Sequence, residues 1–382
     1  MRQLSGIDGT SPEVVLAMLR LALSGEGPAI LPMAAGGIPP ANGGQVPRNV
    51  AVVIETSGST GVPKRVMLGT DALLAGAAAS SAALGGPGQW LLALPAHYVA
   101  GVQVLVRSIA AETLPVVLEP GHFAPAAFVA AAQRLTEPLR YTSLVPVQLA
   151  RLVEAAESGA DVLAVLRRFT AILVGGQAID PELIRRAAGL DIHVVRTYGS
   201  SETAGGCVYN GIPIGNTRVR EAAVDGSIQL EISGAVLAEG YLSDPVLTQA
   251  RFVDEHGERW FRTGDVGAVD AETGVVQVFG RADNVIISGG VKVSLDAVER
   301  AVNALPGLGH AVVVWAPHER WGQAPVIVTV DADHPDLPTI RDLIGTQLAK
   351  SARPDRIVVV DELPLLGSGK VNRQLLVRML SA

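Results

Sequence analysis

The sequence predicts an α/β fold in two parts: a large N-terminal domain of doubly wound αβ layers plus a small β-barrel-like part, and a smaller α+β C-terminal domain. Three observations indicate this. In the first half of the chain, short β-branched runs alternate with Ala- and Leu-rich stretches, which is typical of α/β domains. From Val224 the rhythm changes to closely spaced short strands, and from Leu295 helices and strands mix again. We therefore expect residues 1–281 to form the large domain and residues 282–382 the small one.

The elements of the large domain follow from two kinds of segment. Short apolar runs rich in Val, Ile and Leu predict buried strands, and longer Ala- and Leu-rich stretches bounded by Gly or Pro predict helices. The expected strands are Val50–Glu55, Trp90–Leu94, Tyr141–Val145, Ala171–Val174 and His193–Thr197. The expected helices are Asp71–Leu84, Ala126–Leu135, Val147–Ala156 and Pro181–Ala188.

The remaining elements are shorter and more closely spaced. Three runs predict antiparallel sheet or a small barrel, at Ser227–Ile232, Val275–Phe279 and Val285–Ile287. The small domain is expected to contain helices Leu295–Ala304 and Thr339–Leu348 and strands Ala311–Ala316, Pro325–Val330 and Arg356–Val360.

Composition excludes several classes of function. The 382 residues include 37 acidic side chains and 30 Lys and Arg, a net charge of −7, which argues against a general nucleic-acid binder. The single cysteine, Cys207, excludes an internal disulfide and any zinc site built on several thiolates, and we expect it to be a small core residue. Arg20 interrupts the apolar segment Val14–Leu23, and no run approaches the roughly 20 apolar residues of a spanning helix. We predict a cytoplasmic protein that binds neither nucleic acid nor membrane; a homodimer is an open alternative to a monomer.

The most informative segment is the loop TSGSTGVPK, which directly follows the strand Val50–Glu55. Its glycines let the backbone approach a ligand, and its N–H groups and hydroxyls can surround phosphate oxygens, while Lys64 adds a positive charge. The spacing differs from that of the common P-loop. A flexible connection is the alternative, but the preceding strand and the lysine favour phosphate binding. The candidate residues are Thr56, Ser57, Gly58, Ser59, Thr60, Gly61 and Lys64.

A second polar segment, Thr197–Thr203 (TYGSSET), follows another predicted strand. The carboxylate of Glu202, placed beside phosphates, would suit Mg²⁺, which prefers oxygen ligands. Tyr198 can offer a flat face to a base. The alternative is a capped helix start, with Ser200 or Ser201 as the cap and Glu202 in the first turn.

Charged residues also lie next to glycines in two further regions of the sequence. RTGD and GRAD present Asp265 and Arg281, which can hydrogen-bond vicinal ribose hydroxyls, although each segment alone is only a turn signal. Near the C-terminus, GSGKVNR places Lys370 between flexible residues, where it can reach into a cleft; a solvated tail turn is the alternative.

The order of these motifs resembles the acyl-adenylate-forming superfamily, which includes acyl- and aryl-CoA synthetases, adenylation domains of peptide synthetases and luciferases. The resemblance covers Val50 to Arg378. The short chain and the segments Ser143–Leu152 and Thr203–Gly211 resemble the o-succinylbenzoate–CoA ligases of menaquinone biosynthesis, of the compact actinobacterial type. Two positions depart from the family: Ser59 stands where Thr is usual, and Asn284 where many relatives carry a second Asp.

The resemblance implies an ATP-dependent ligase that adenylates an acid with MgATP and then transfers the acyl group to the co-substrate CoA. It implies that the loop Ser57–Lys64 holds the β- and γ-phosphates, that Ser201 contacts the α-phosphate and that Glu202 holds Mg²⁺. Lys370 would bridge the attacking carboxylate and the α-phosphate. The adenine would be framed by Gly175, Gly176, Gln177 and Tyr198, and the ribose would be bound by Asp265 and Arg281; Gly199 and Ser200 would also belong to the ATP site.

The resemblance also implies that the small domain is mobile. It would rotate about the hinge Asp283 and bring the CoA channel, Ser288, Gly289 and Gly290, to the site for the second step. His97 matches the position at the mouth of the family's acyl pocket. A dicarboxylate substrate needs a cation or several donors for its second carboxylate, because a bare buried charge is costly. The candidates by neighbourhood are Arg196, Asn210, Arg218 and His193.

Three alternatives remain open at this point. The chain could be a CoA ligase for another aryl or acyl acid, or a free-standing adenylation protein that loads a carrier protein. It could also be a catalytically silent nucleotide-binding module, which the presence of Lys64, Glu202, Asp265 and Lys370 argues against.

Overall fold

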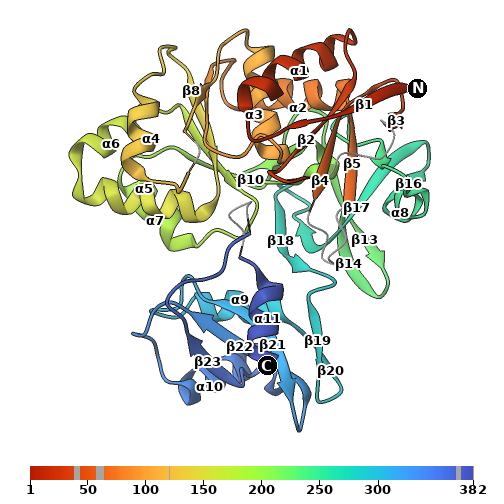
Figure 1. The fold of residues 1–382 in the computed structure, drawn as a ribbon. Coiled ribbons are helices and arrows are strands. Elements are labelled where there is room, and N and C mark those ends of the chain that lie inside the picture. Colours follow the sequence, from red (N-terminus) through yellow and green to blue (C-terminus); the bar gives the residue numbers. More distant parts are fainter. Residues whose placement is uncertain (38–43, 57–63, 120, 367–370, 382) are drawn as a thin grey trace. The chain divides into compact units, whose positions relative to one another are not determined.

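A computed structural model describes residues 1–37, 44–56, 64–119, 121–366 and 371–381 (Figure 1). The chain forms two compact units. The first comprises Met1–Arg220, Glu231–Thr263 and Asp270–Val276, and the second comprises Glu221–Leu230, Gly264–Val269 and Gln277–Ala382. The expected α/β class is confirmed, with helices and sheets in both units. The domain boundary between residues 281 and 282 stays a prediction.

The first sheet lies wholly in the first unit and carries one end of the phosphate-loop segment. Its strand order is β15-β5-β4-β2-β1-β3, with parallel pairing from β1 through β2 to β4 and an antiparallel β4–β5 pair. The predicted strand at Val50–Glu55 is confirmed as β4 and extends by one residue. The strands are β1 Arg2–Asp8, β2 Ala29–Met33, β3 Gln45–Val46, β4 Val50–Thr56, β5 Lys64–Gly69 and β15 Gly240–Tyr241.

The second sheet of the first unit holds the other candidate residues. Its order is β12-β11-β10-β9-β8-β6-β7, and β10, β9, β8, β6 and β7 are parallel. The strands are β6 Gln89–Leu92, β7 Val116–Val117, β8 Arg140–Leu144, β9 Ala171–Gly175, β10 Val194–Ser200, β11 Gly205–Tyr209 and β12 Ile212–Pro213. The strand predicted at His193–Thr197 is present, but its predicted end at Thr197 was wrong. β10 continues to Ser200, because β11 pairs antiparallel with its last residues and keeps the backbone extended.

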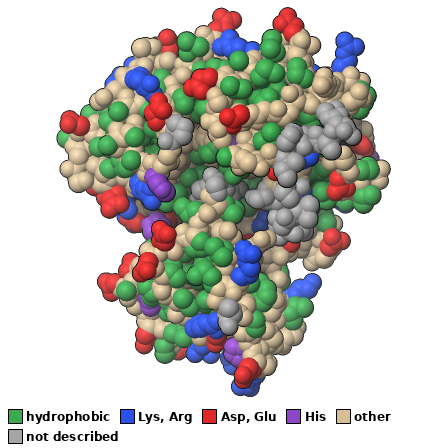
Figure 2. Space-filling model, in the orientation of Figure 1, with side chains coloured by type: hydrophobic (Ala, Val, Ile, Leu, Met, Phe, Trp, Pro, Cys, Tyr) green, Lys and Arg blue, Asp and Glu red, His purple; other side chains and the backbone are tan. Residues whose placement is uncertain are grey.

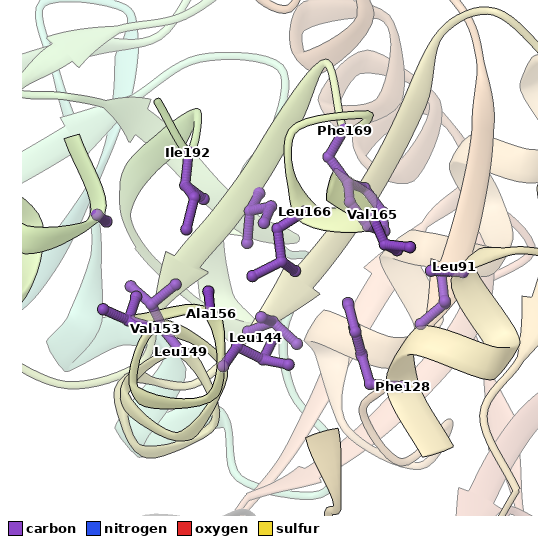
Figure 3. Packing of buried hydrophobic residues seen from close by; sticks show 14 of the residues in the cluster. Leu91, Phe128, Leu144, Leu149, Val153, Ala156, Val165, Leu166, Phe169 and Ile192 are labelled. Carbon is purple, nitrogen blue, oxygen red and sulfur yellow. The ribbon is translucent and has the colours of Figure 1, made fainter. Parts of the chain in front are cut away.

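Helices cover these sheets, and several begin with proline at the first turn, where its missing N–H is not needed (Figure 1). The side chains of Phe128, Leu144, Leu149 and Leu166 converge in one core cluster that fixes β8 and β9 against their helices (Figure 3). The helices are α1 Pro12–Ser24, α2 Thr70–Ala83, α3 Val99–Ala110, α4 Pro125–Ala132, α5 Pro146–Ser158, α6 Ala160–Leu166, α7 Pro181–Gly189, η1 Ser201–Thr203 and α8 Pro245–Arg251.

The third sheet has the order β13-β14-β17-β16, with β18 paired to β17, and its strands are divided between the two units. Two of the three runs expected beyond Val224, Ser227–Ile232 and Val275–Phe279, correspond to β14 and β18 of this sheet, whereas Val285–Ile287 belongs to the next sheet. The strands are β13 Arg218–Val224, β14 Ser227–Ser233, β16 Phe252–Glu255, β17 Glu258–Val269 and β18 Val276–Arg281.

The second unit has its own sheet, of order β20-β19-β22-β21 with β23 paired to β22. Val298, Val302, Val313 and Ile327 form its core with residues of the neighbouring helices. The elements are β19 Val285–Ser288, β20 Val291–Ser294, α9 Leu295–Asn303, β21 Val312–His318, β22 Gly322–Thr329, α10 Leu337–Gln347, η2 Lys350–Ala352, β23 Arg356–Val359 and α11 Arg373–Ser381.

The surface carries no obvious basic stripe on the face that Figure 2 shows. Lys and Arg side chains lie singly there, interspersed with acidic ones. In the parts of the chain that the structure describes, no helix combines the length and the apolar character needed to cross a membrane.

Candidate active site

The two ends of the predicted phosphate loop are held together by the first sheet. Thr56 at the end of β4 pairs with Lys64 at the start of β5, and the Thr56 hydroxyl donates to the Lys64 carbonyl over 3.4 Å. The loop between them, with Ser57, Gly58, Ser59, Thr60 and Gly61, lies outside the described residues. The hairpin therefore places Lys64 at the sheet edge where the loop begins and ends.

The segments predicted to bind adenine lie at the ends of β9 and β10, where glycines leave the backbone without side chains. Gly175 pairs with Thr197, and a Cβ on Gly175 would lie 2.3 Å from the Thr197 hydroxyl oxygen. A Cβ on Gly199 would lie 2.1 Å from the carbonyl oxygen of Gly205. Gly176 follows with φ of 84°, a conformation that favours glycine. Only glycine fits at these positions, and Gln177 and Tyr198 flank them.

The turn after β10 fixes Ser201 and Glu202. The backbone N–H of Ser200 donates to the Thr203 hydroxyl oxygen over 2.9 Å, and that hydroxyl donates to the Gly205 carbonyl over 2.8 Å. Ser201 is buried, and the Ser200 hydroxyl has no hydrogen-bond partner among the residues that the structure describes. The helix start considered from the sequence is thus a single 3-10 turn, η1, held by Thr203.

The carboxylate of Glu202 is oriented by Tyr241. The Tyr241 hydroxyl donates to Glu202 Oε1 over 2.8 Å, and the backbone N–H of Ala238 donates to the Glu202 carbonyl over 2.8 Å. No other hydrogen bond to this carboxylate is formed by the described residues, which leaves Oε2 available. One half-buried carboxylate with a free oxygen fits Mg²⁺, which is usually held by one or two carboxylates together with phosphates.

Pairing within the first sheet brings Glu202 and Lys64 into one neighbourhood. Tyr241 lies on the edge strand β15, where it pairs with Val66 of β5, the strand that begins at Lys64. β5 also contacts η1. The strand after the phosphate loop therefore packs beside the turn that carries Ser201 and Glu202.

The candidate ribose residues lie together in the second unit. Arg281 forms an ion pair with Asp265 over 3.2 Å and a bidentate pair with Asp283, with both distances 3.0 Å. The backbone N–H of Arg281 donates to one carboxylate oxygen of Asp296 on α9, and the side-chain amide of Asn284 donates to the other oxygen. Asp265 lies within strand β17 rather than in the turn expected from RTGD. Lys370 lies outside the described residues.

The predicted CoA-channel residues form a tight hairpin. Ser288 ends β19, and Gly289 and Gly290 both have positive φ, 58° and 84°, as a type I′ hairpin turn requires. A Cβ on Gly289 would lie 2.7 Å from the Trp321 ring. The geometry of the turn itself thus explains both glycines, whether or not they line a channel.

The predicted acyl-pocket residues are dispersed. His97 is half-buried, and burial lowers the pKa of its imidazole, which favours the neutral form. Arg196, Asn210 and His193 are exposed, and Asn210 accepts from the Arg196 N–H. The Arg218 side chain is 67% exposed and pairs with Glu258. Among the described residues, none of these four polar side chains forms a hydrogen bond or an ion pair with His97.

Cys207 is a core residue, as expected. It is fully buried on β11, and burial raises the pKa of its thiol to about 12, so the reactive thiolate is suppressed.

Sequence reasoning missed Tyr241. It lies 39 positions from Glu202 in the sequence, and nothing in its local segment indicates that it contacts a carboxylate. Only the pairing of β15 with β5 brings the two side chains together.

Comparisons with known proteins agree with this geometry. Family models match twice: the AMP-binding enzyme model over residues 24–269, and the AMP-binding enzyme C-terminal domain model over residues 297–370. A probable 2-succinylbenzoate–CoA ligase of Mycobacterium tuberculosis is 39% identical, and the match covers 99% of this chain and 98% of that protein. A 2-succinylbenzoate–CoA ligase of Listeria monocytogenes is 31% identical over 85% of this chain and 68% of that protein.

A solved structure shows the same fold. The o-succinylbenzoate CoA synthetase of Bacillus subtilis, in complex with its acyl-adenylate intermediate, superposes with a TM-score of 0.72 at 22% identity, covering 98% of this chain and 82% of that one. The match spans 98% of the mycobacterial protein but only 68% of the Listeria protein, which is longer. This difference agrees with the compact type expected from the sequence.

Proposed function

The chain belongs to the AMP-binding enzyme family, as the motif order predicted, and we propose that it is the ligase that adenylates o-succinylbenzoate and transfers the acyl group to CoA. The observation that carries the proposal is the pairing of β15 with β5, which sets Glu202 beside the strand that follows the phosphate loop. The near full-length match to a probable 2-succinylbenzoate–CoA ligase supports this choice of acid.

In the first step, a carboxylate oxygen of the acid attacks the α-phosphorus of ATP. A new P–O bond forms, the bond to the β-phosphate breaks, and pyrophosphate leaves. Such transfers depend on positioning and charge neutralisation more than on covalent participation by the protein. We assign Lys64 and the loop before it to the β- and γ-phosphates, Ser201 to the α-phosphate and Lys370 to the attacking carboxylate.

We assign the adenine to glycine backbone and the ribose to a pair of charged side chains. The glycine backbone at Gly175, Gly176 and Gly199 lets the adenine approach the ends of β9 and β10, with Tyr198 beside it. Asp265 and Arg281 are assigned to the ribose hydroxyls. On binding, hydrogen bonds to these hydroxyls would replace part of the ion pair between the two side chains.

Mg²⁺ is the proposed cofactor, and Glu202 is its proposed protein ligand. When bound, the ion would neutralise phosphate charge as the new bond forms. Tyr241 donates to one carboxylate oxygen, which fixes the carboxylate and leaves its other oxygen for the ion.

In the second step, the CoA thiol attacks the acyl carbonyl carbon. The C–S bond forms, the C–O bond to the phosphate breaks, AMP leaves, and the thiol proton passes to solvent. Domain alternation about Asp283, with Ser288–Gly290 lining the CoA channel, is part of this proposal. The proposed setting is the cytoplasm, with small molecules as the only partners.

The test is mass spectrometry of the products after incubation with ATP, Mg²⁺, CoA and o-succinylbenzoate. We expect the acyl-adenylate when CoA is omitted, and the acyl-CoA with AMP when it is present. Formation of the adenylate without capture by CoA would instead support a protein that loads a carrier. Turnover of other aromatic acids with no turnover of o-succinylbenzoate would replace the proposed acid.

A further inference from the structure

Arg259 of β17 contacts the segment that orients Glu202. One terminal nitrogen of its guanidinium donates to the Ala238 carbonyl over 2.7 Å, and the other donates to the Glu239 carbonyl over 2.9 Å. The side chain is half-buried, and its guanidinium lies 4.4 Å from the centre of the Phe252 ring. Arg259 therefore uses both terminal nitrogens to hold two consecutive peptide groups.

The charge of Arg259 is not neutralised by an ion pair with any carboxylate among the described residues. The carboxylate of Glu239 accepts instead from the Asn49 side-chain amide over 2.6 Å. Burial lowers the pKa of the Arg259 guanidinium, and the charges of Glu239 and Asp254 oppose this effect only in part. Because removing a cation from water without a paired anion costs free energy, the stability that Arg259 adds is limited. The geometry fixed by its two hydrogen bonds is the stronger reason for an arginine at this position.

The segment that Arg259 holds leads into a short edge strand. β15 consists of only two residues, Gly240 and Tyr241, and it is the end strand of the first sheet, paired with β5. Strand pairing therefore satisfies only one of its edges, and the other depends on side chains. Thr248 of α8 accepts from the Tyr241 backbone N–H over 2.9 Å, and Arg259 supplies the donors for the two residues before the strand.

The same segment forms two hydrogen bonds with Glu202. The backbone N–H of Ala238 donates to the Glu202 carbonyl, and the Tyr241 hydroxyl donates to the Glu202 carboxylate, both over 2.8 Å. The Ala238 carbonyl accepts from Arg259, so one residue connects the guanidinium to the turn that carries Glu202. A shift of the segment 238–241 would therefore move the carboxylate of Glu202 with it.

We propose that Arg259 is a positioning residue for the metal-binding carboxylate: it fixes the segment 238–241 and, through it, the orientation of Glu202 towards Mg²⁺. The proposal rests on the proposed function, in which Glu202 holds the ion of MgATP. A lysine cannot take over this role fully, because a single ammonium nitrogen cannot hold two carbonyl groups in the fixed geometry of a guanidinium.

The test measures how Mg²⁺ changes the binding of a fluorescent ATP analogue, mant-ATP, in the absence of an acid and therefore without turnover. Dissociation constants are measured in EDTA and in Mg²⁺ for the wild type, Arg259→Met, Arg259→Lys and Arg251→Met. Arg251 is the matched control, because it too donates to a backbone carbonyl, that of Arg262, and no hydrogen bond between described residues joins it to Glu202.

The expected effect is a loss of the advantage that Mg²⁺ gives to nucleotide binding. The ratio of the dissociation constant in EDTA to that in Mg²⁺ should fall about 3–10-fold in Arg259→Met, as for the loss of roughly one hydrogen bond, while the value in EDTA stays within about twofold. Arg259→Lys should give an intermediate ratio, and Arg251→Met should match the wild type.

A double-mutant cycle separates positioning from a general structural role. Tyr241→Phe removes the hydrogen bond through which the segment holds the carboxylate, so Arg259→Met should lower the ratio less in that background than in the wild type. Full additivity of the two changes would overturn the proposal. An equal weakening of mant-ATP binding in EDTA and in Mg²⁺ would do so too, because it would show a structural role.

Should Arg259→Met fail to fold, Arg259→Lys takes its place in the same cycle, and additivity there overturns the proposal. A wild type that binds mant-ATP equally well in EDTA and in Mg²⁺ would overturn the assignment of Glu202 to the ion, and this inference with it. A wild type that depends on Mg²⁺, with an unchanged ratio in both Arg259 variants, would overturn this inference alone.

Discussion

Two regions that carry proposed nucleotide-binding residues are held in different ways. In the first unit, the turn after β10 is positioned by backbone: strand pairing with β11, glycines that admit no Cβ, and the Thr203 hydroxyl. In the second unit, Asp265, Arg281 and Asp283 hold one another by charge. The first region is fixed by backbone contacts that leave no room for an added Cβ, whereas the second would exchange ion pairs when a ligand binds.

The difference predicts how each region responds to change. Where backbone contacts fix the geometry, adding a single methyl group should lower the free energy of unfolding. Where partly exposed charges pair, the free energy of unfolding should change little and any effect should appear in the reaction, because exposed pairs contribute little to stability.

The largest effect is expected from the charge proposed to act on the reacting carboxylate. Lys370→Ala should slow adenylation by at least about 10²–10³-fold, since removing one preorganised charge donor from a transition state commonly has that effect. Capture of a preformed acyl-adenylate by CoA should stay nearly normal. The two half-reactions are measured separately, with Lys350→Ala in η2 as the control. An equal loss in both half-reactions would contradict domain alternation.

The backbone-held region is tested by glycine substitutions. In Gly199→Ala the new Cβ would meet the Gly205 carbonyl oxygen at 2.1 Å, so we expect the free energy of unfolding to fall by about 1–3 kcal/mol. The matched control is Gly189→Ala at the end of α7, where no atom lies within 4 Å. Urea unfolding of both variants decides: equal stability would mean that the close approach of β10 and β11 is not enforced.

The orientation of Glu202 is tested by removing one hydroxyl. Tyr241→Phe loses a hydrogen bond worth about 0.5–1.5 kcal/mol, so the Mg²⁺ concentration for half-maximal adenylation should rise about 2–10-fold. Tyr141→Phe is the control, because it too removes a buried hydroxyl, one that donates to the carbonyls of Leu84 and Gly86. A Mg²⁺ requirement that shifts equally in both variants, or in neither, would rule out the positioning role.

The smallest effect on stability is expected in the charge-held region. The Arg281 and Asp283 side chains are 41% and 50% exposed, so Asp283→Ala should change the free energy of unfolding by less than about 1 kcal/mol. The rate of CoA capture should change more, if Asp283 is the hinge. A large loss of stability with unaltered CoA capture would assign Asp283 a structural role only.

The sequence predicted those parts of the molecule that depend on local pattern. Val50–Ile54 and Ala171–Val174 are continuous apolar runs, and both lie in strands of the structure. The motif order indicated the family without any tertiary information. Helix α3 escaped notice because its valines and isoleucine favour strands, and the packing of its buried face decides its conformation.

Features that depend on distant pairing could not be predicted in this way. Tyr198–Ser200 has the composition of a loop, and it is extended only because β11 pairs with it. The contact of Tyr241 with Glu202 and the burial of Arg107 beside Tyr209 both join segments far apart in the sequence.

Adenylation at the proposed site is tested most directly by the exchange of labelled pyrophosphate into ATP in the absence of CoA, measured with and without o-succinylbenzoate. We expect exchange that requires both the acid and Mg²⁺ and that is lost in Glu202→Gln. Exchange that does not depend on the acid, or that persists undiminished in Glu202→Gln, would contradict it.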